Sequence, residues 1–144
     1  MNKKKNGFTL IELLAVIIIL GILMIIAIPA VTSYINNSRK SSYIDTAKEV
    51  IGAARNKVND KVLKMFDTNA TYYIPVDYIK TENDLKSPYG KFEEAYVVVI
   101  YDGEGYKYYW ISIDETGTGV DKITPYDKLD EDDIKSDLKA KDIP

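Results

Sequence analysis

The first third of the chain is built around an uninterrupted apolar run. From Leu13 to Val31 the sequence contains no charged residue, and Ile and Leu dominate it. Within the run, only Gly21 and Pro29 weaken a helix. At about 1.5 Å of rise per residue, the 19 residues cover the thickness of a bilayer's hydrocarbon core. The pattern therefore predicts a membrane-spanning helix.

A helical period continues beyond this run. Apolar residues recur at steps of three and four, with charged residues between them, which is typical of an amphipathic helix. The apolar positions are Ile44, Ala47, Ile51, Ala54, Val58, Val62 and Met65. A single helix from Phe8 to about Phe66 would be roughly 88 Å long. The apolar stripe of its second half needs another element to cover it.

Two β-branched and aromatic runs in residues 95–113, "AYVVVIYDGEGYKYYWISI", predict that cover. They flank a glycine-containing turn from Asp102 to Gly105, which is typical of a β-hairpin. Both faces of the hairpin carry apolar side chains. Val97 and Val99 lie on one face and Tyr96, Val98 and Ile100 on the other, and we expect one of the two faces to pack on the helix and the other to stay partly exposed. Residues 114–124 predict a glycine loop and a short third strand.

The remaining segments are more polar. Residues 67–94 are rich in turn formers and are expected to form a loop. Residues 125–144 are rich in charge and predict either a short helix capped near Asp130 or a mobile acidic tail. The fold class that follows is α+β. One long N-terminal helix has a hydrophobic half that spans the membrane and an amphipathic half packed on a small antiparallel sheet.

The composition excludes most enzyme classes. The chain has no Cys and no His. Without Cys there is no disulfide, thiolate metal site or Cys nucleophile, and without His the usual general base and the commonest zinc ligand are missing. The sequence contains no other recognisable catalytic constellation. We therefore expect a protein that is not an enzyme and needs no cofactor.

The charge distribution predicts an orientation in the membrane. Lys3, Lys4 and Lys5 precede the apolar run, and the first basic residues after it are Arg39 and Lys40. This bias places the N-terminus in the cytoplasm and most of the chain outside. Without residues 1–7, the 19 basic side chains fall to 16 against 22 acidic ones, a net charge of -6. An acidic surface argues against a general role in coating nucleic acid.

Glu12 does not fit an ordinary signal or anchor, because a carboxylate gains nothing at the edge of a membrane helix. A positive partner would appear if the chain were cut between Gly7 and Phe8, since the new α-amino group would lie four residues from Glu12. In a medium of low dielectric the two charges would attract strongly. The amine could belong to the same subunit or to an adjacent one.

The stretch "KKKNGFTLIELLAVIIILGILMIIAIPAV" resembles the N-terminus of type IV pilins and of the pseudopilins of type II secretion and competence systems. The resemblance covers about residues 3–35. It implies that a prepilin peptidase cleaves after Gly7 and methylates the amine of Phe8, and that the subunit then enters a helical filament. Glu12 would pair with the Phe8 amine during assembly. Pro29 would mark a kink, or a place where the helix melts on packing.

The resemblance also implies a division of the chain. Residues 1–7 form the leader, residues 8–34 the transmembrane and filament-core helix, and residues 35–144 the extracellular head. Within the head, residues 35–66 continue the helix, 67–94 form the loop, 95–124 the sheet and 125–144 the acidic segment.

The implied partners are further copies of the chain in a helical filament, the peptidase, a membrane assembly platform and minor pilins. The resemblance does not identify a DNA or surface receptor that the filament contacts. The implied location is the plasma membrane, as a single-pass precursor, and then a filament on the cell surface. The lack of Cys favours a Gram-positive type of host. A pseudopilin of a secretion or DNA-uptake machine is the alternative. A membrane-anchored ectodomain that binds a ligand is a remote alternative.

Three weaker patterns lie in the head. "SPYGKFEEAYVVV" resembles the turn before the sheet of major pseudopilins, some of which bind calcium, and Asp114, Glu115 and Asp121 could supply oxygens, although their spacing fits no compact calcium loop. The strand "GYKYYWI", with Lys107, could stack on DNA or glycans, but an aromatic-packed strand is favoured. Asn36 and Asn69 begin Asn-x-Ser/Thr patterns, and unmodified asparagine is the default expectation in a bacterial chain.

Overall fold

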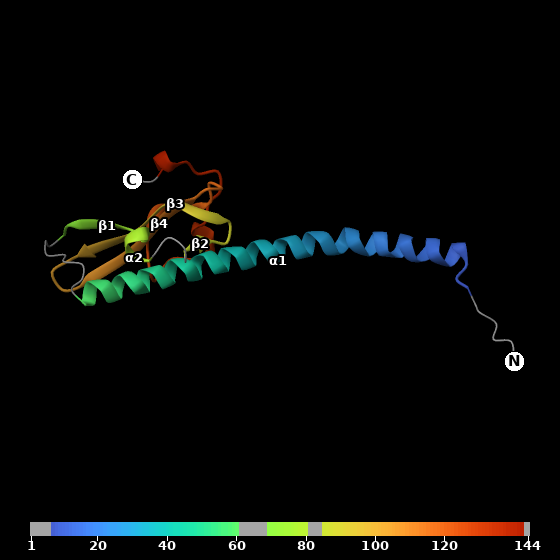
Figure 1. Cartoon of the computed structure of the whole chain (residues 1–144), viewed down its shortest axis with the longest axis horizontal. Coiled ribbons are helices and arrows are strands. Elements are labelled where there is room, and N and C mark those ends of the chain that lie inside the picture. Colours follow the sequence, from blue (N-terminus) through green and yellow to red (C-terminus); the bar gives the residue numbers. More distant parts are fainter. Residues whose placement is uncertain (1–6, 61–68, 81–84, 143–144) are drawn as a thin grey trace. The chain divides into compact units, whose positions relative to one another are not determined.

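The computed structural model describes residues 7–60, 69–80 and 85–142 (Figure 1). Contacts divide the chain into two units that meet between Asn36 and Asn37. The first unit is the N-terminal part of helix α1. The second unit contains the rest of α1 and a small antiparallel sheet. The α+β class expected from the sequence is therefore confirmed.

Helix α1 runs from Leu10 to Asn59 without interruption. It passes through Pro29, which lacks an N–H and leaves one carbonyl of the preceding turn without its helical donor. The helix does not end or melt at this proline in the isolated chain. The expected C-terminal end near Phe66 differs from the structure, because α1 ends at Asn59. Val62 and Met65 lie outside the described residues.

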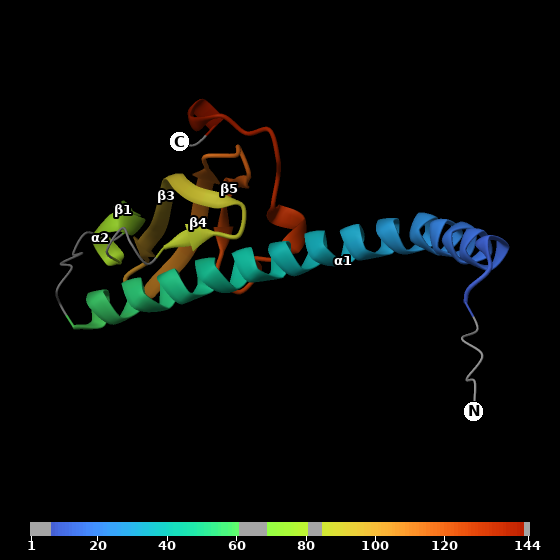
Figure 2. The ribbon, with the colours of Figure 1, turned by 45° about the vertical axis from the view of Figure 1, so that its right-hand side comes forward.

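The sheet of the second unit has the strand order β1-β3-β4-β5, and all of its pairings are antiparallel (Figure 2). The strands are β1 (Thr71–Pro75), β3 (Gly90–Tyr101), β4 (Tyr106–Asp114) and β5 (Gly119–Pro125). A short strand β2 (Lys86–Ser87) pairs with the start of β3. The hairpin around residues 102–105 and the third strand are thus confirmed.

The core of the second unit lies between α1 and one face of the sheet. The described apolar positions expected from the helical period are all buried, and Tyr43 and Val50 join them. The ring of Phe92 packs edge-on against Tyr43 at 5.6 Å and Trp110 at 5.9 Å between centroids. Alternate residues of the two central strands complete the core, as β-strand geometry requires; they are Val97, Val99, Tyr108 and Trp110.

The segment from residue 67 to residue 94 differs most from the expectation of a loop. It contains β1, the one-turn helix α2 (Val76–Ile79), β2 and the beginning of β3. β1 forms because it pairs with β3, with Tyr73 opposite Val98. Such pairing is a long-range interaction, which local turn signals do not reveal. Pro88 and Tyr89 form the turn that joins β2 to β3.

In the described part of the C-terminal segment, up to residue 142, the chain packs against the sheet. Its short 3-10 helix η1 (Glu131–Asp133) is capped by Asp130, whose carboxylate accepts from the N–H of Asp132 at 2.8 Å. The capped-helix alternative is therefore the one observed. A second 3-10 helix, η2 (Ala140–Asp142), follows. Leu138 packs beside Val98, which is fully buried, so this second face of the sheet is less exposed than expected.

Candidate functional site

The peptide bond between Gly7 and Phe8 lies in exposed chain immediately before α1. Neither residue is helical, and Phe8 is 87% exposed. Apart from Gly7 itself and its two neighbours in the chain, no described residue has an atom within 4 Å of the position that a Cβ would take at Gly7. The first helical residue is Leu10. An enzyme could therefore bind this bond without unfolding the helix.

Thr9 and Glu12 form reciprocal hydrogen bonds at the start of α1. The backbone N–H of Thr9 donates to Glu12 Oε2 at 2.8 Å, and the N–H of Glu12 donates to Thr9 Oγ1 at 3.3 Å. The Thr9 hydroxyl also donates to Glu12 Oε2, at 3.0 Å. This is the arrangement of a capping box, which satisfies N–H groups that a helix start leaves without partners.

The capping box gives Glu12 a partner that the charge argument did not identify. The sequence did contain the signal, since Thr9 and Glu12 have the Ser/Thr-x-x-Glu spacing of the motif. Both hydrogen bonds that the Glu12 carboxylate accepts, one from the N–H and one from the hydroxyl of Thr9, reach the same oxygen, Oε2. The cap also supplies no positive charge. The carboxylate therefore has a structural role as a cap and still lacks a counter-ion among the described residues.

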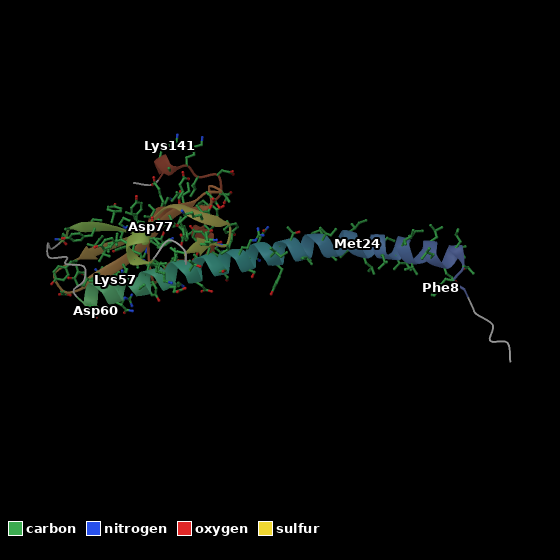
Figure 3. The ribbon with its side chains drawn as sticks, in the orientation of Figure 1. Phe8, Met24, Lys57, Asp60, Asp77 and Lys141 are labelled. Carbon is green, nitrogen blue, oxygen red and sulfur yellow. The ribbon has the colours of Figure 1, made fainter. Side chains whose placement is uncertain are left out.

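The apolar run behind Glu12 is exposed along its whole length in the single chain. Figure 3 shows Phe8 and Met24 with their side chains projecting from this part of the chain. Met24 is 58% exposed, and the other large apolar residues of the run are exposed as well. In the part of the chain that the structure describes, α1 is the one helix long and apolar enough to cross a membrane. A surface of this kind requires lipid or other apolar helices around it.

Comparison with known proteins supports this interpretation of the N-terminus. Residues 2–28 match the family model described as the prokaryotic N-terminal methylation motif. The start of the chain therefore carries the prokaryotic N-terminal methylation motif, in agreement with its resemblance to type IV pilins. The fimbrial protein EcpC of Eikenella corrodens is 41% identical to this pilin-like chain over 61 residues. That match covers 42% of the chain and 40% of EcpC. No solved structure matches the chain significantly.

In the pilin-like head, the candidate calcium residues do not come together as a site. Asp114 is buried, and its Oδ1 accepts from the N–H groups of Thr116 and Thr118 at 2.9 and 3.1 Å. Its Oδ2 accepts from the hydroxyl of Ser87 at 2.7 Å. Among the described residues, no group of three acidic side chains could hold a metal ion.

The neighbours of Asp114 have other roles. Glu115 is exposed and its Oε1 accepts from the N–H of Lys91 at 2.9 Å, while Asp121 lies on the edge strand β5. Two of the three candidate carboxylates thus accept hydrogen bonds from the protein and the third lies on another strand, so calcium binding by them stays a weak prediction. Asp114 organises the β4–β5 loop, because a buried carboxylate is stable when protein donors satisfy its oxygens.

The tyrosine-rich strand is mainly a packing element. Tyr108 and Trp110 are buried under α1, so they cannot stack on a ligand. Lys107 forms an ion pair with Asp102 at 2.9 Å. This ammonium, with the N–H groups of Gly105 and Glu104, lowers the pKa of the Asp102 carboxyl well below its ordinary value. The charge of Lys107 is therefore already paired within the hairpin. This favours a strand whose aromatic side chains pack in the core over a strand that stacks on DNA or glycans.

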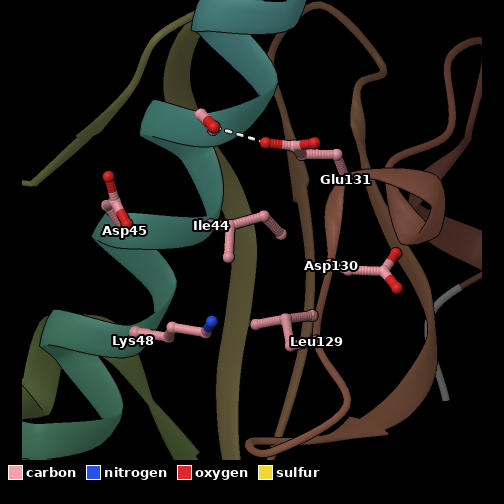
Figure 4. A pocket seen from close by; sticks show the side chains of 7 residues that line it. Ile44, Asp45, Lys48, Leu129, Asp130 and Glu131 are labelled. Carbon is pink, nitrogen blue, oxygen red and sulfur yellow. Dashed lines mark hydrogen bonds between the residues drawn. The ribbon is translucent and has the colours of Figure 1, made fainter.

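A recess of about 290 Å³ lies in the head between α1 and the C-terminal segment (Figure 4). Ile44 and Leu129 form its apolar floor. The hydroxyl of Ser41 donates to Glu131 across one end, and Lys48 lies near the other. The hydrogen bond fixes η1 on the helix. The lining combines both signs of charge and shows no cluster that selects a particular ligand.

Proposed function

We propose that the chain is a prepilin, the precursor of a filament subunit. A prepilin peptidase would cut between Gly7 and Phe8 and methylate the new amine, and the subunit would then polymerise at the cell surface. The observation that carries this proposal is the combination of an exposed Gly7–Phe8 bond, a capped helix start and an exposed apolar helix in the segment that matches the methylation motif. The role is structural and needs neither enzymatic activity nor a cofactor.

Cleavage would complete the site around Glu12. Hydrolysis of the Gly7–Phe8 bond leaves an ammonium group on Phe8, one residue before the cap. Glu12 Oε2 is occupied by Thr9, whereas no described residue donates a hydrogen bond to Oε1. The Phe8 ammonium of the same subunit or of a neighbour could therefore pair with Oε1 while the cap stays intact. In a low-dielectric filament core, this pairing would compensate two charges that are costly to bury alone.

The apolar half of α1 would move from lipid to the core of the filament. Because lipid and packed helices are both apolar, this transfer gains little from hydrophobicity alone. Packing and the Glu12–ammonium pair would supply specificity for the filament. Before assembly the subunit would lie in the plasma membrane with its N-terminus in the cytoplasm, and the residues after the apolar run would be exported. A membrane assembly platform and minor pilins are the further partners that this route requires.

A pseudopilin of a secretion or DNA-uptake machine is the second candidate, because it would share the same N-terminal segment. We expect cells that make this chain as the abundant subunit to display surface filaments that contain it. Immunoelectron microscopy with an antibody to the head measures this directly. The absence of such filaments, in cells where the processed chain is abundant, would favour the pseudopilin. A binding ectodomain on a simple anchor would form no filament and would keep its leader.

A further inference from the structure

Two segments of the chain have the Asn-x-Ser/Thr pattern that accepts N-linked glycans on exported proteins. One is Asn36-Asn37-Ser38 and the other is Asn69-Ala70-Thr71. A sequence pattern of this length occurs often by chance. The structure, however, separates the two occurrences by their local conformation, so the chain contains its own control.

Asn69 lies where a modifying enzyme can reach it. The residue is exposed, belongs to no helix or strand, and has a φ of 64°, in the left-handed region that Asn tolerates better than most residues. Its backbone N–H donates to the carbonyl of Tyr101 at 2.6 Å, which holds the turn against β3. Thr71, the third residue of the pattern, is the exposed first residue of β1. Asn69 and Ala70 therefore lie outside any helix or strand, and only Thr71, at the very end of β1, belongs to a regular element.

Asn36 lies in a different environment. Residues 36–38 are all inside α1, so binding the tripeptide in a non-helical conformation would break helical hydrogen bonds. Asn36 also follows the end of the apolar run, Val31, by only five residues, or about 7.5 Å along a helix. The headgroup layer on one side of a bilayer is about 5 to 7 Å thick. In the membrane-bound precursor, Asn36 would lie at the lipid surface.

We propose that Asn69, and not Asn36, is the acceptor of an N-linked glycan on this chain. The inference rests on the proposed export of the head. The donor is a glycan carried on a polyprenyl pyrophosphate. Nδ2 of Asn69 forms a bond to the anomeric carbon, and the bond from that carbon to the pyrophosphate oxygen breaks. The lipid pyrophosphate leaves with the electron pair, and an amide proton passes to a base of the transferase.

A glycan at this position has a physical consequence for the head. β1 is at the end of the strand order, so its outer edge pairs with no described strand. Exposed strand edges tend to pair with other chains, and proteins protect them. Tyr73, two residues beyond Thr71, is 42% exposed and adds an apolar surface to this edge. A bulky hydrated glycan beside β1 would cover the edge and restrict lateral pairing between heads.

The test is the mass of the peptides from the full chain, purified from the cells that naturally produce it. We expect the peptide with Asn69 to carry one discrete glycan and the peptide with Asn36 to have its unmodified mass. Asn69→Gln and Thr71→Ala should each remove the glycan. Thr71→Ser, which keeps the hydroxyl, should retain it, and Asn36→Gln should change nothing. Thr71→Ala leaves Asn69 in place, so loss of the glycan there cannot be ascribed to a changed turn residue.

An unmodified peptide at Asn69, or a glycan at Asn36 instead, would overturn the inference. The N-terminal peptide in the same digest reports on the proposed function separately. If Phe8 is methylated but Asn69 is unmodified, the result contradicts the proposed glycan and leaves the proposed processing intact. If Asn69 carries a glycan but the chain still begins at Met1, the result contradicts the proposed cleavage after Gly7 and leaves the proposed glycan intact.

Discussion

Replacing Glu12 with glutamine is expected to stop filament assembly while cleavage after Gly7 continues. Glutamine can replace glutamate in a capping box, so the start of α1 should keep its hydrogen bonds. It cannot provide the negative charge that would pair with the Phe8 ammonium. Assembly is measured as the fraction of the chain recovered in sheared, sedimented filaments. We expect that fraction to fall at least about tenfold, which corresponds to the loss of about 1.4 kcal/mol per subunit contact.

Two matched variants separate the charge of Glu12 from its role as a cap. Glu12→Ala removes both and should assemble as poorly as Glu12→Gln. Thr9→Ala keeps the carboxylate and removes the Thr9 hydroxyl, at a typical cost of about 1 kcal/mol to the helix start. We expect Thr9→Ala to assemble better than either Glu12 variant. Normal assembly of Glu12→Gln would show that the filament does not need the charge of Glu12.

Replacing Trp110 with alanine is expected to destabilise the head more than any surface substitution. Trp110 is fully buried between α1 and the sheet, and its ring packs against Phe92. Truncating a buried aromatic side chain leaves a cavity and typically costs about 3 to 5 kcal/mol. The free energy of unfolding can be measured for the full chain in detergent micelles. Far-ultraviolet circular dichroism is the appropriate signal, because the chain has a single Trp.

Tyr78→Ala is the control for that measurement. Tyr78 is another aromatic residue of the head but is 63% exposed, and its ring lies 5.9 Å from the ammonium of Lys57. An exposed cation–π contact contributes about 0.5 to 1 kcal/mol. We expect the cost of Tyr78→Ala to stay within that range. Similar effects of the two variants would contradict the placement of Trp110 at the centre of the core.

Local periodicity was sufficient to predict the large elements. The uncharged run and the apolar stripe behind it predicted one helix with two environments. The described residues of that stripe are all buried; they are Ile44, Ala47, Ile51, Ala54 and Val58. The hairpin was predictable because its turn and both strands are adjacent in the sequence. Tyr43 was missed as a core residue, although it lies four residues before Ala47 and therefore on the same helix face.

The remaining features depend on contacts between distant residues. β1 is short and flanked by turn formers, and it exists because β3 pairs with it. Asp114 looked like a metal ligand, since the sequence does not show that Ser87 lies beside it; their hydrogen bond joins residues that are 27 positions apart. The fold of the C-terminal segment depends likewise on backbone pairing between Gly119 and Lys135. At the N-terminus, by contrast, the candidate residues lie within one short stretch, so the sequence alone could identify them.

The mass of the N-terminal peptide tests the central claim most directly. The chain should be isolated from cells with and without an active prepilin peptidase. We predict a chain that begins at Phe8 with one methyl group on its amine when the peptidase is active, and one that retains residues 1–7 when it is not. A chain that begins at Met1 in both cells, or one cut near Ser33 as for an ordinary secretory signal, would contradict the proposal that this protein is a prepilin.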